Sequence, residues 1–72
     1  MSTIVDAVTR YKQVRGNTTR YGFRYTLDNG EVHDRIAWVS SETDEATERD
    51  ARGVMLLDEL AQAEINRVLS DG

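Results

Sequence analysis

Apolar and polar residues alternate through the first part of the chain and then change to a helical spacing. Every second residue from Tyr21 to Leu27 is large and apolar, and the next segment repeats this period of two. Such a period is typical of strands that bury one face. From Ser41 onward apolar residues recur every three or four positions, as in an amphipathic helix. The pattern predicts one small α+β domain, in which a three-stranded antiparallel meander (1–39) packs against one long C-terminal helix (41–70).

The dipeptide Asn29-Gly30 is the strongest turn signal in the chain. A two-residue type I′ turn needs positive φ at both central residues, and this pair adopts it at low cost. The turn places Phe23 opposite Ile36 and Tyr21 opposite Trp38, with all four side chains on one face. A three-residue loop would set a charged residue opposite Phe23. The apolar pattern therefore favours the two-residue turn and makes Trp38 a core anchor beneath the start of the helix, or failing that an interface residue.

Two assignments are open for residues 3–14. Val8 and Tyr11 also suit a helical stripe, but the β-branched residues and the Gly-Asn turn that follows favour a strand. A three-residue loop over residues 16–18 would pair Tyr11 with Phe23 and extend the same apolar face. The sequence does not decide whether this strand pairs within its own chain or with a neighbour.

The helical segment begins with a capping pattern and carries an apolar stripe. Ser41 is followed three residues later by Asp44, and acidic residues crowd the first turns, where the helix dipole favours anions. The stripe consists of Val54, Leu57, Ala61, Ile65 and Val68, flanked by Leu60 and Leu69. Gly53 indicates a kink, a close approach to the sheet, or a break between two helices. Because a helix of this length outreaches the strands, one end is expected to project beyond the sheet or to contact another chain.

The net charge of −4 hides an asymmetry along the chain. Residues 1–30 hold five Lys or Arg and two Asp, whereas residues 31–72 hold four Arg and eleven Asp or Glu. In the two-residue register the sheet face away from the helix is basic and includes Arg10, Lys12, Arg20, Arg24 and Arg35. This face fits an anionic partner, either an acidic protein surface or nucleic acid. The acidic start of the helix fits a basic partner through Glu42, Asp44, Glu45 and Glu48.

Three further apolar residues of the helix lie off the main stripe and are expected to form an oligomer or partner surface: Met55, Leu56 and Leu69. Catalysis has little support, because the single histidine, His33, is expected on the exposed sheet face without a nucleophile beside it. Asp34 is expected opposite Tyr25, as a hydrogen-bonded residue at the rim of the core. The sequence contains no metal-binding or phosphate-binding motif, so no enzyme activity, metal or cofactor is predicted.

The segment GFRYTLDNGEV, from Gly22 to Val32, spans a strand and a turn, and the basic residues of the sheet lie around it. The order of strands, turn and helix resembles the three-stranded arm-binding domain of phage integrases over roughly Tyr11 to Leu60. That resemblance implies DNA binding through the sheet. A compact chain without cysteine or proline also resembles the small accessory proteins of bacteriophages, including virion components and host-interaction factors.

The function expected from the sequence is a non-enzymatic protein-interaction or assembly module. It would dock through the basic sheet face and the acidic helix onto another protein or onto copies of itself. DNA binding through the basic sheet is the alternative, which is disfavoured because the aromatic residues are expected to face the core, where they cannot stack on bases. The start of the chain does not read as a signal peptide, which predicts a location in the host cytoplasm or the virion rather than secretion, without membrane association.

Overall fold

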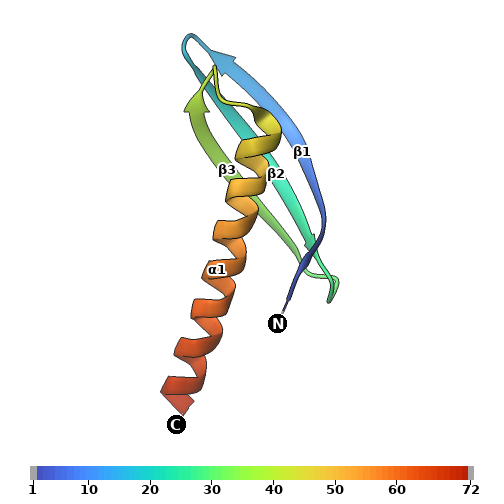
Figure 1. The fold of residues 1–72 in the computed structure, drawn as a ribbon, viewed down its shortest axis with the longest axis vertical. Helices are drawn as coiled ribbons and strands as arrows, with labels where there is room; N and C mark the ends of the chain where they lie inside the picture. The colour runs from blue at the N-terminus through green and yellow to red at the C-terminus, as the bar shows by residue number, and fades with distance from the viewer. Residues whose placement is uncertain (1, 72) are drawn as a thin grey trace.

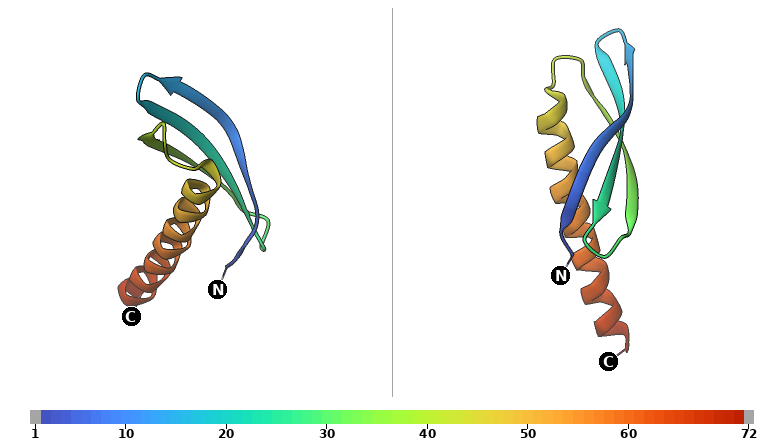
Figure 2. Two further views of the ribbon diagram at one scale, coloured as in Figure 1. Left: turned by 45° about the horizontal axis from the view of Figure 1, so that its top comes forward. Right: turned by 90° about the vertical axis from the view of Figure 1, so that its right-hand side faces the viewer.

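The computed structural model describes residues 2–71, which form a three-stranded antiparallel sheet with one long helix against one face (Figure 1). The elements are β1 (Ile4–Arg15), β2 (Thr18–Leu27), β3 (Val32–Ser40) and α1 (Glu45–Asp71), with β2 in the centre of the sheet. The predicted α+β meander is confirmed, and β1 pairs with β2 of the same chain. Figure 2 shows the sheet curving around the first half of α1, while the second half projects beyond it as predicted.

The register between β2 and β3 differs by one residue from the predicted one. Tyr21 pairs with Ala37 and not with Trp38, and Ile36 lies opposite Gly22. Alternate residues of a strand point to opposite faces, so the shift moves Ile36 and Trp38 from the helix side to the outer face. The prediction that Trp38 anchors the core is therefore wrong.

A three-residue loop between β2 and β3 causes this shift. The N–H of Leu27 donates to the carbonyl of Glu31 at 2.8 Å, and the N–H of Gly30 donates to the carbonyl of Leu27 at 3.0 Å. Gly30 has a φ of +89°, whereas Asn29 is not among the residues with positive φ. A type I′ turn needs positive φ at both positions, so the loop is a type I turn closed by a left-handed glycine.

The β1–β2 connection is a two-residue turn, and not the three-residue loop over residues 16–18 that would pair Tyr11 with Phe23. Gly16 has a φ of +59° and Asn17 has no positive φ, as in a type II′ turn. The register then shifts twice along β1, once between Thr9 and Tyr11 and once nearer the start of the strand. The two-residue turn sets Tyr11 opposite Gly22 on the outer face, and not opposite a phenylalanine in the core. The first shift leaves Arg10 as an extra residue of β1 without a partner residue in β2.

The core lies between the helix side of β2 and the first half of α1. Tyr21, Phe23 and Tyr25 are at most 2% exposed, and the rings of Tyr21 and Phe23 stack with their centroids 5.4 Å apart. Leu56 of α1 is completely buried in the same cluster. A Cβ added to Gly53 would lie 3.2 Å from Cε1 of Tyr25. Of the three roles predicted for Gly53, the close approach is confirmed, and α1 runs through it without a break.

The helix begins at Glu45, later than the predicted start. Asp44 is the cap, because its Oδ2 accepts hydrogen bonds from the N–H of Thr47 at 3.0 Å and from the Thr47 hydroxyl at 2.9 Å. Ser41 instead holds the loop against the β1–β2 turn, since its N–H donates to the carbonyl of Asn17 at 2.8 Å. The predicted cap at Ser41 is therefore wrong, although the acidic first turn is present.

The row of α1 residues that faces the sheet also differs from the predicted stripe. Gly53 and Leu56 are buried and Leu60 is half-buried, whereas Val54 is 68% exposed. The prediction that Leu56 is an exposed interface residue is wrong. Residues 61–70 are all exposed. Across residues 2–71 no helix is both long and apolar enough to cross a lipid bilayer.

Candidate functional site

The outer face of the sheet, away from α1, carries an apolar and aromatic surface. Ile36 and Trp38 of β3 are 53% and 56% exposed, and Val8 and Tyr11 of β1 are 41% and 42% exposed. Arg20 of β2 lies between them, directly opposite Trp38. These five residues are called the outer-face cluster. They come from all three strands, so the fold of the whole sheet is needed to bring them together.

Gly22 forms the floor of the outer-face cluster. It lies opposite Tyr11 on one side and Ile36 on the other. The ring of Tyr11 covers it so closely that an added Cβ would lie 2.1 Å from Cε1 of that ring. An open hollow of about 310 Å³ surrounds this point, and its walls include Arg10 and Asp34. The missing side chain of Gly22 therefore lets an aromatic ring rest on the backbone and leaves a depression beside it.

Arg20 is held by aromatic rings and not by a carboxylate. Its Cζ lies 5.6 Å from the ring centroid of Tyr11 and 5.5 Å from that of Trp38, which is within cation–π range. Its Nε is buried and has no hydrogen-bond partner in the part of the chain from Ser2 to Ser70. The arrangement is an aromatic–arginine–aromatic stack at the surface of the molecule.

Farther along the outer face, Arg24 and Asp34 form a two-pronged ion pair. Nε of Arg24 donates to Oδ1 of Asp34 at 2.8 Å, and Nη2 donates to Oδ2 at 3.2 Å. The hydrogen bond from Arg24 holds the pKa of Asp34 below its ordinary value, and the positive charges of Arg24 and Arg10 act in the same direction. Among residues 2–70, Arg10 and Arg20 have no carboxylate within salt-bridge distance. They are therefore available to a carboxylate from outside the chain.

The predicted basic face is divided between the two faces of the sheet. Lys12 pairs in register with Tyr21 on the helix side, and its Nζ lies 5.8 Å from the centroid of that ring. Arg35 also points toward α1, where its Nη2 lies 3.2 Å from Oε2 of Glu59. Arg10 is the extra residue at the β1 bulge and is exposed. The prediction of a single basic face is wrong because it rested on the two-residue register for Arg35 and on a three-residue loop over residues 16–18 for Lys12.

The same register error exchanged the faces of His33 and Asp34. Asp34 lies on the outer face, and Tyr25 instead donates its hydroxyl to the carbonyl of Arg49 at 2.6 Å. His33 is half-buried on the helix side, where its Nε2 lies 3.8 Å from Oε1 of Glu31. Over residues 2–70 no three His, Asp or Glu side chains lie close enough to share a metal ion.

The acidic residues at the start of α1 bind mainly to their own chain. Oε2 of Glu45 accepts a hydrogen bond from the hydroxyl of Thr9 at 3.0 Å, which joins the helix to β1. Glu48 pairs with the arginine one turn later at 2.7 Å, and Asp44 caps the helix. Glu42 is exposed. Three of the four carboxylates predicted to dock a basic partner thus support the fold directly.

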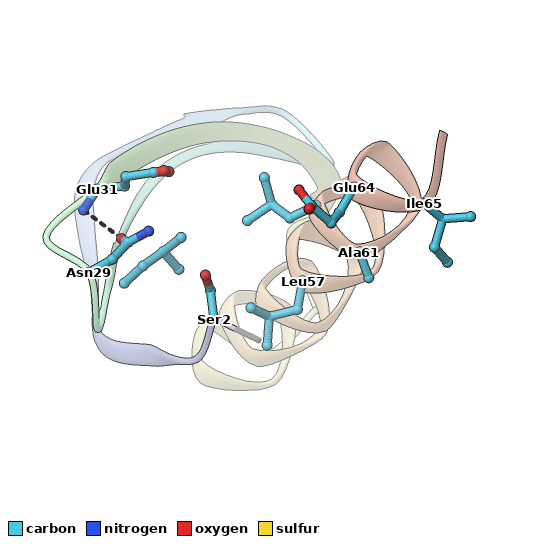
Figure 3. Close-up of a pocket in the computed structure, with 9 residues that line it drawn as sticks. Ser2, Asn29, Glu31, Leu57, Ala61, Glu64 and Ile65 are labelled. Carbon is cyan, nitrogen blue, oxygen red and sulfur yellow. Dashed lines mark hydrogen bonds between the residues drawn. The ribbon is translucent and has the colours of Figure 1, made fainter. Parts of the chain in front are cut away.

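A second hollow of about 640 Å³ lies between α1 and the β2–β3 loop (Figure 3). Leu27 lines it from the sheet, and Leu57 and Ala61 line it from the helix. In Figure 3 the side chain of Glu64 points toward the hollow and that of Ile65 points away from the loop. The hollow therefore separates the sheet from the projecting half of the helix. Two of the predicted apolar surface residues of this helix are indeed exposed: Met55 and Leu69.

Comparisons with protein families, with curated proteins and with solved structures found no match. The outer-face cluster must therefore be interpreted from its own chemistry. Sequence reasoning missed it by placing Tyr11, Ile36 and Trp38 in the core. The available signal was Gly22, because an isolated glycine in a central strand indicates that another group approaches the backbone closely.

Proposed function

We propose that this chain is a non-enzymatic protein-interaction module that binds an acidic, partly apolar segment of another protein on the outer-face cluster. The observation that carries the proposal is the exposed stack of Tyr11, Arg20 and Trp38 beside the hollow over Gly22. Tryptophan, tyrosine and arginine are the residue types most enriched among interface hot spots. Their grouping with Ile36 makes a contiguous surface, and such patches mark interaction sites more often than scattered apolar residues do.

The charges on this face define the partner. Asp34 is already neutralised by Arg24, which leaves the positive charges of Arg10 and Arg20 beside the apolar surface. A carboxylate that reaches either arginine would gain a charge-assisted hydrogen bond. An apolar side chain next to it would fill the hollow over Gly22. A segment with alternating acidic and apolar residues supplies both groups.

The test uses the fluorescence of Trp38, which is the only tryptophan in the chain and belongs to the outer-face cluster. A short peptide of alternating glutamate and leucine is titrated into the protein. We expect a blue shift of the emission as the ring loses contact with water. A peptide in which lysine replaces glutamate should bind at least about tenfold more weakly, which corresponds to roughly 1.4 kcal/mol.

The matched controls are Arg20→Glu and Arg67→Glu. Both variants replace a positive charge with a negative one. Arg67, however, lies on the exposed projecting end of α1 and not on the sheet. Arg20→Glu should abolish the response to the glutamate peptide, and Arg67→Glu should leave it unchanged. Equal responses to the two peptides, no response to either, or equal losses in the two variants would each contradict the proposal.

Binding of single-stranded nucleic acid is the second candidate, because the structure turns the rings of Tyr11 and Trp38 outward. Exposed aromatic rings next to arginine can stack on bases, at about 1–3 kcal/mol per base. The net charge of −4 opposes this candidate. A thymidine oligonucleotide that quenches Trp38, in a protein that ignores the glutamate peptide, would replace the first proposal with this one.

A further inference from the structure

A second apolar stripe of α1 is largely uncovered by residues 2–70, and only its member Leu57 is half-buried. The stripe consists of Val54, Leu57, Ala61, Ile65 and Val68. Leu56, which lies in the core, immediately precedes Leu57, and one residue corresponds to about 100° of rotation around a helix. The stripe therefore points sideways from the row that packs on the sheet. Its members Val54, Ile65 and Val68 are 68%, 52% and 59% exposed.

The projecting end of α1 carries this apolar face without any packing. Residues 61–70 are all exposed, and their side-chain hydrogen bonds to residues 2–70 stay within the helix, between Glu64 and Arg67 and between Gln62 and Asn66. Helices in proteins take most of their stability from the packing of an apolar face. A second helix laid along the stripe would supply this packing.

The spacing of the stripe is the same in both directions from Ala61. Its members follow one another at intervals of three, four, four and three residues. When a second helix runs antiparallel with Ala61 facing Ala61, Leu57 of each copy meets Ile65 of the other. Val54 of each copy then meets Val68 of the other. The small side chain at the centre lets the two helices approach closely.

We propose that two copies of this chain form a dimer through antiparallel pairing of the stripe centred on Ala61. A two-fold interface must be self-complementary, because each residue contacts on the other copy the residue that contacts it in return. The symmetric spacing of Val54, Leu57, Ile65 and Val68 meets that requirement with apolar groups throughout. The surface is separate from the outer-face cluster, so each copy in the dimer keeps its docking surface.

The size of the stripe indicates a weak dimer. From Val54 to Val68 the helix rises roughly 21 Å, and a helix is about 10 Å wide, so the contact is smaller than the roughly 800 Å² per partner of a standard interface. The neighbouring hollow adds the apolar surface of Leu27 and Leu60, which a second helix can cover in part. Asp58 and Glu64 flank the stripe, and each chain has a net charge of −4. Added salt should therefore strengthen the dimer by screening the repulsion between copies.

The test is a disulfide cross-link. Because the chain contains no cysteine, any disulfide that forms must join the introduced thiols. Ala61→Cys places a thiol at the centre of the proposed interface, where the two copies meet. Ala63→Cys is the matched control, since it is also an exposed alanine of the projecting end but lies about 200° around the helix. Under mild oxidation we expect Ala61→Cys to form the disulfide-linked dimer at least about tenfold faster than Ala63→Cys. Equal rates, or no dimer from Ala61→Cys, would overturn the proposal.

Two mixed variants test the direction of the helices. Val54→Cys and Val68→Cys are mixed in equal amounts and oxidised. Antiparallel pairing gives mainly the mixed dimer, whereas parallel pairing gives each variant linked to itself and overturns the proposed geometry. The double variant that combines Trp38→Ala with Ala61→Cys should form the disulfide-linked dimer as fast as Ala61→Cys alone. If the dimer does not form, the result of the peptide-binding test on the outer-face cluster is unaffected. If the peptide does not bind, the result of the cross-linking test is equally unaffected.

Discussion

Two glycines show at the residue scale how a missing side chain organises this molecule. The ring of Tyr11 packs where Gly22 lacks a side chain on the outer face, and Ile4 and Tyr25 pack where Gly53 lacks one in the core. The neighbours differ in their freedom to move. Tyr11 is half-exposed at the surface, whereas Tyr25 is buried and its hydroxyl is bonded to the backbone of α1. The same substitution should therefore have opposite consequences at the two sites.

Gly22→Ala should damage docking more than stability. The new Cβ displaces the ring of Tyr11, which can swing into solvent, and with it the stack on Arg20. We expect affinity for the glutamate peptide to fall at least about tenfold, while the free energy of unfolding changes by less than about 1 kcal/mol. Trp38 emission measures the first quantity and urea unfolding the second. A variant that keeps full affinity would contradict the role given to Gly22.

Gly53→Ala should damage stability and leave docking unchanged. The added methyl group would lie 3.1 Å from Cδ1 of Ile4 and 3.2 Å from Cε1 of Tyr25, and the buried ring has little room to move. Overpacking of this kind costs about 1–3 kcal/mol, against about 1 kcal/mol gained from the better helix propensity of alanine. Urea unfolding should therefore show a net loss, and a stabilised variant would show that the core can expand at this point.

At the scale of elements, the sequence predicted the order of strands and helix but not how they pair. The change of period from two to three or four was enough to place the sheet and the helix. The β2–β3 loop has three residues in place of the predicted two, because Asn29-Gly30 fits more than one turn type, as Gly16-Asn17 also does. Packing decides between them, since α1 can approach the sheet closely over Ala37, and a tryptophan at that position would hold it away.

The register also explains why the candidate site could be predicted only in part. Arg20 and Arg24 are predicted on the outer face in either register. The large apolar residues of β2 occupy every second position, and the two arginines lie at the alternate positions. Residues of the edge strands depended on loop length and on a bulge, and these change sides when the pairing moves by one residue. Side-chain contacts that favour the observed register, such as the ion pair of Arg35 with Glu59, join residues far apart in the sequence. No local sequence pattern indicates them.

The cap of α1 makes the helix sensitive to acid. Hydrogen bonds from Thr47, first from its N–H and then from its hydroxyl, hold the pKa of Asp44 below its ordinary value. A carboxyl with a lowered pKa in the folded state contributes stability above its unfolded pKa of about 3.9, and this contribution is lost as the pH falls through the folded pKa. Asp44→Asn still caps the helix but no longer titrates.

Urea unfolding followed by circular dichroism at neutral and at acidic pH measures this effect. The loss of stability on acidification should be smaller in Asp44→Asn than in the parent chain. Asp50→Asn is the matched control, because Asp50 is an exposed carboxyl of the same helix for which no side-chain hydrogen bond is found within residues 2–70. An equal change of the pH dependence in both variants would show that the cap is not its cause.

At the scale of the whole molecule, the chain is elongated, with extents of 50 × 21 × 15 Å, and its two proposed surfaces differ in character. The outer-face cluster attracts its partner partly through charge, whereas the stripe centred on Ala61 is apolar and flanked by acidic residues. Attraction between charges weakens with ionic strength, and so does repulsion between like-charged copies. Salt should therefore act on the two associations in opposite directions.

Raising the salt concentration from about 50 mM to about 500 mM should weaken binding of the glutamate peptide and increase the fraction of dimer. Fluorescence titration and analytical ultracentrifugation of the same samples measure the two quantities. Ile65→Glu should remove the dimer at all salt concentrations, and Gln62→Glu, which adds the same charge on another side of the helix, should only weaken it. A dimer that dissociates as the salt concentration rises would indicate a charged interface in place of the apolar stripe.

The three-residue loop between β2 and β3 has one more consequence, which concerns how the surface could arise or be lost. A two-residue turn over Asn29-Gly30 would bring Asp28 into β2 opposite Glu31 and give the alternative pairing of the strands. Ile36 and Trp38 would then turn toward α1, and Arg35 would turn outward. A change of turn type at Asn29-Gly30 would thus exchange the inner and outer faces of β3 without changing any of its residues. The identity of the docking surface is set by the length of a turn at its edge, and related chains should be compared first at that position.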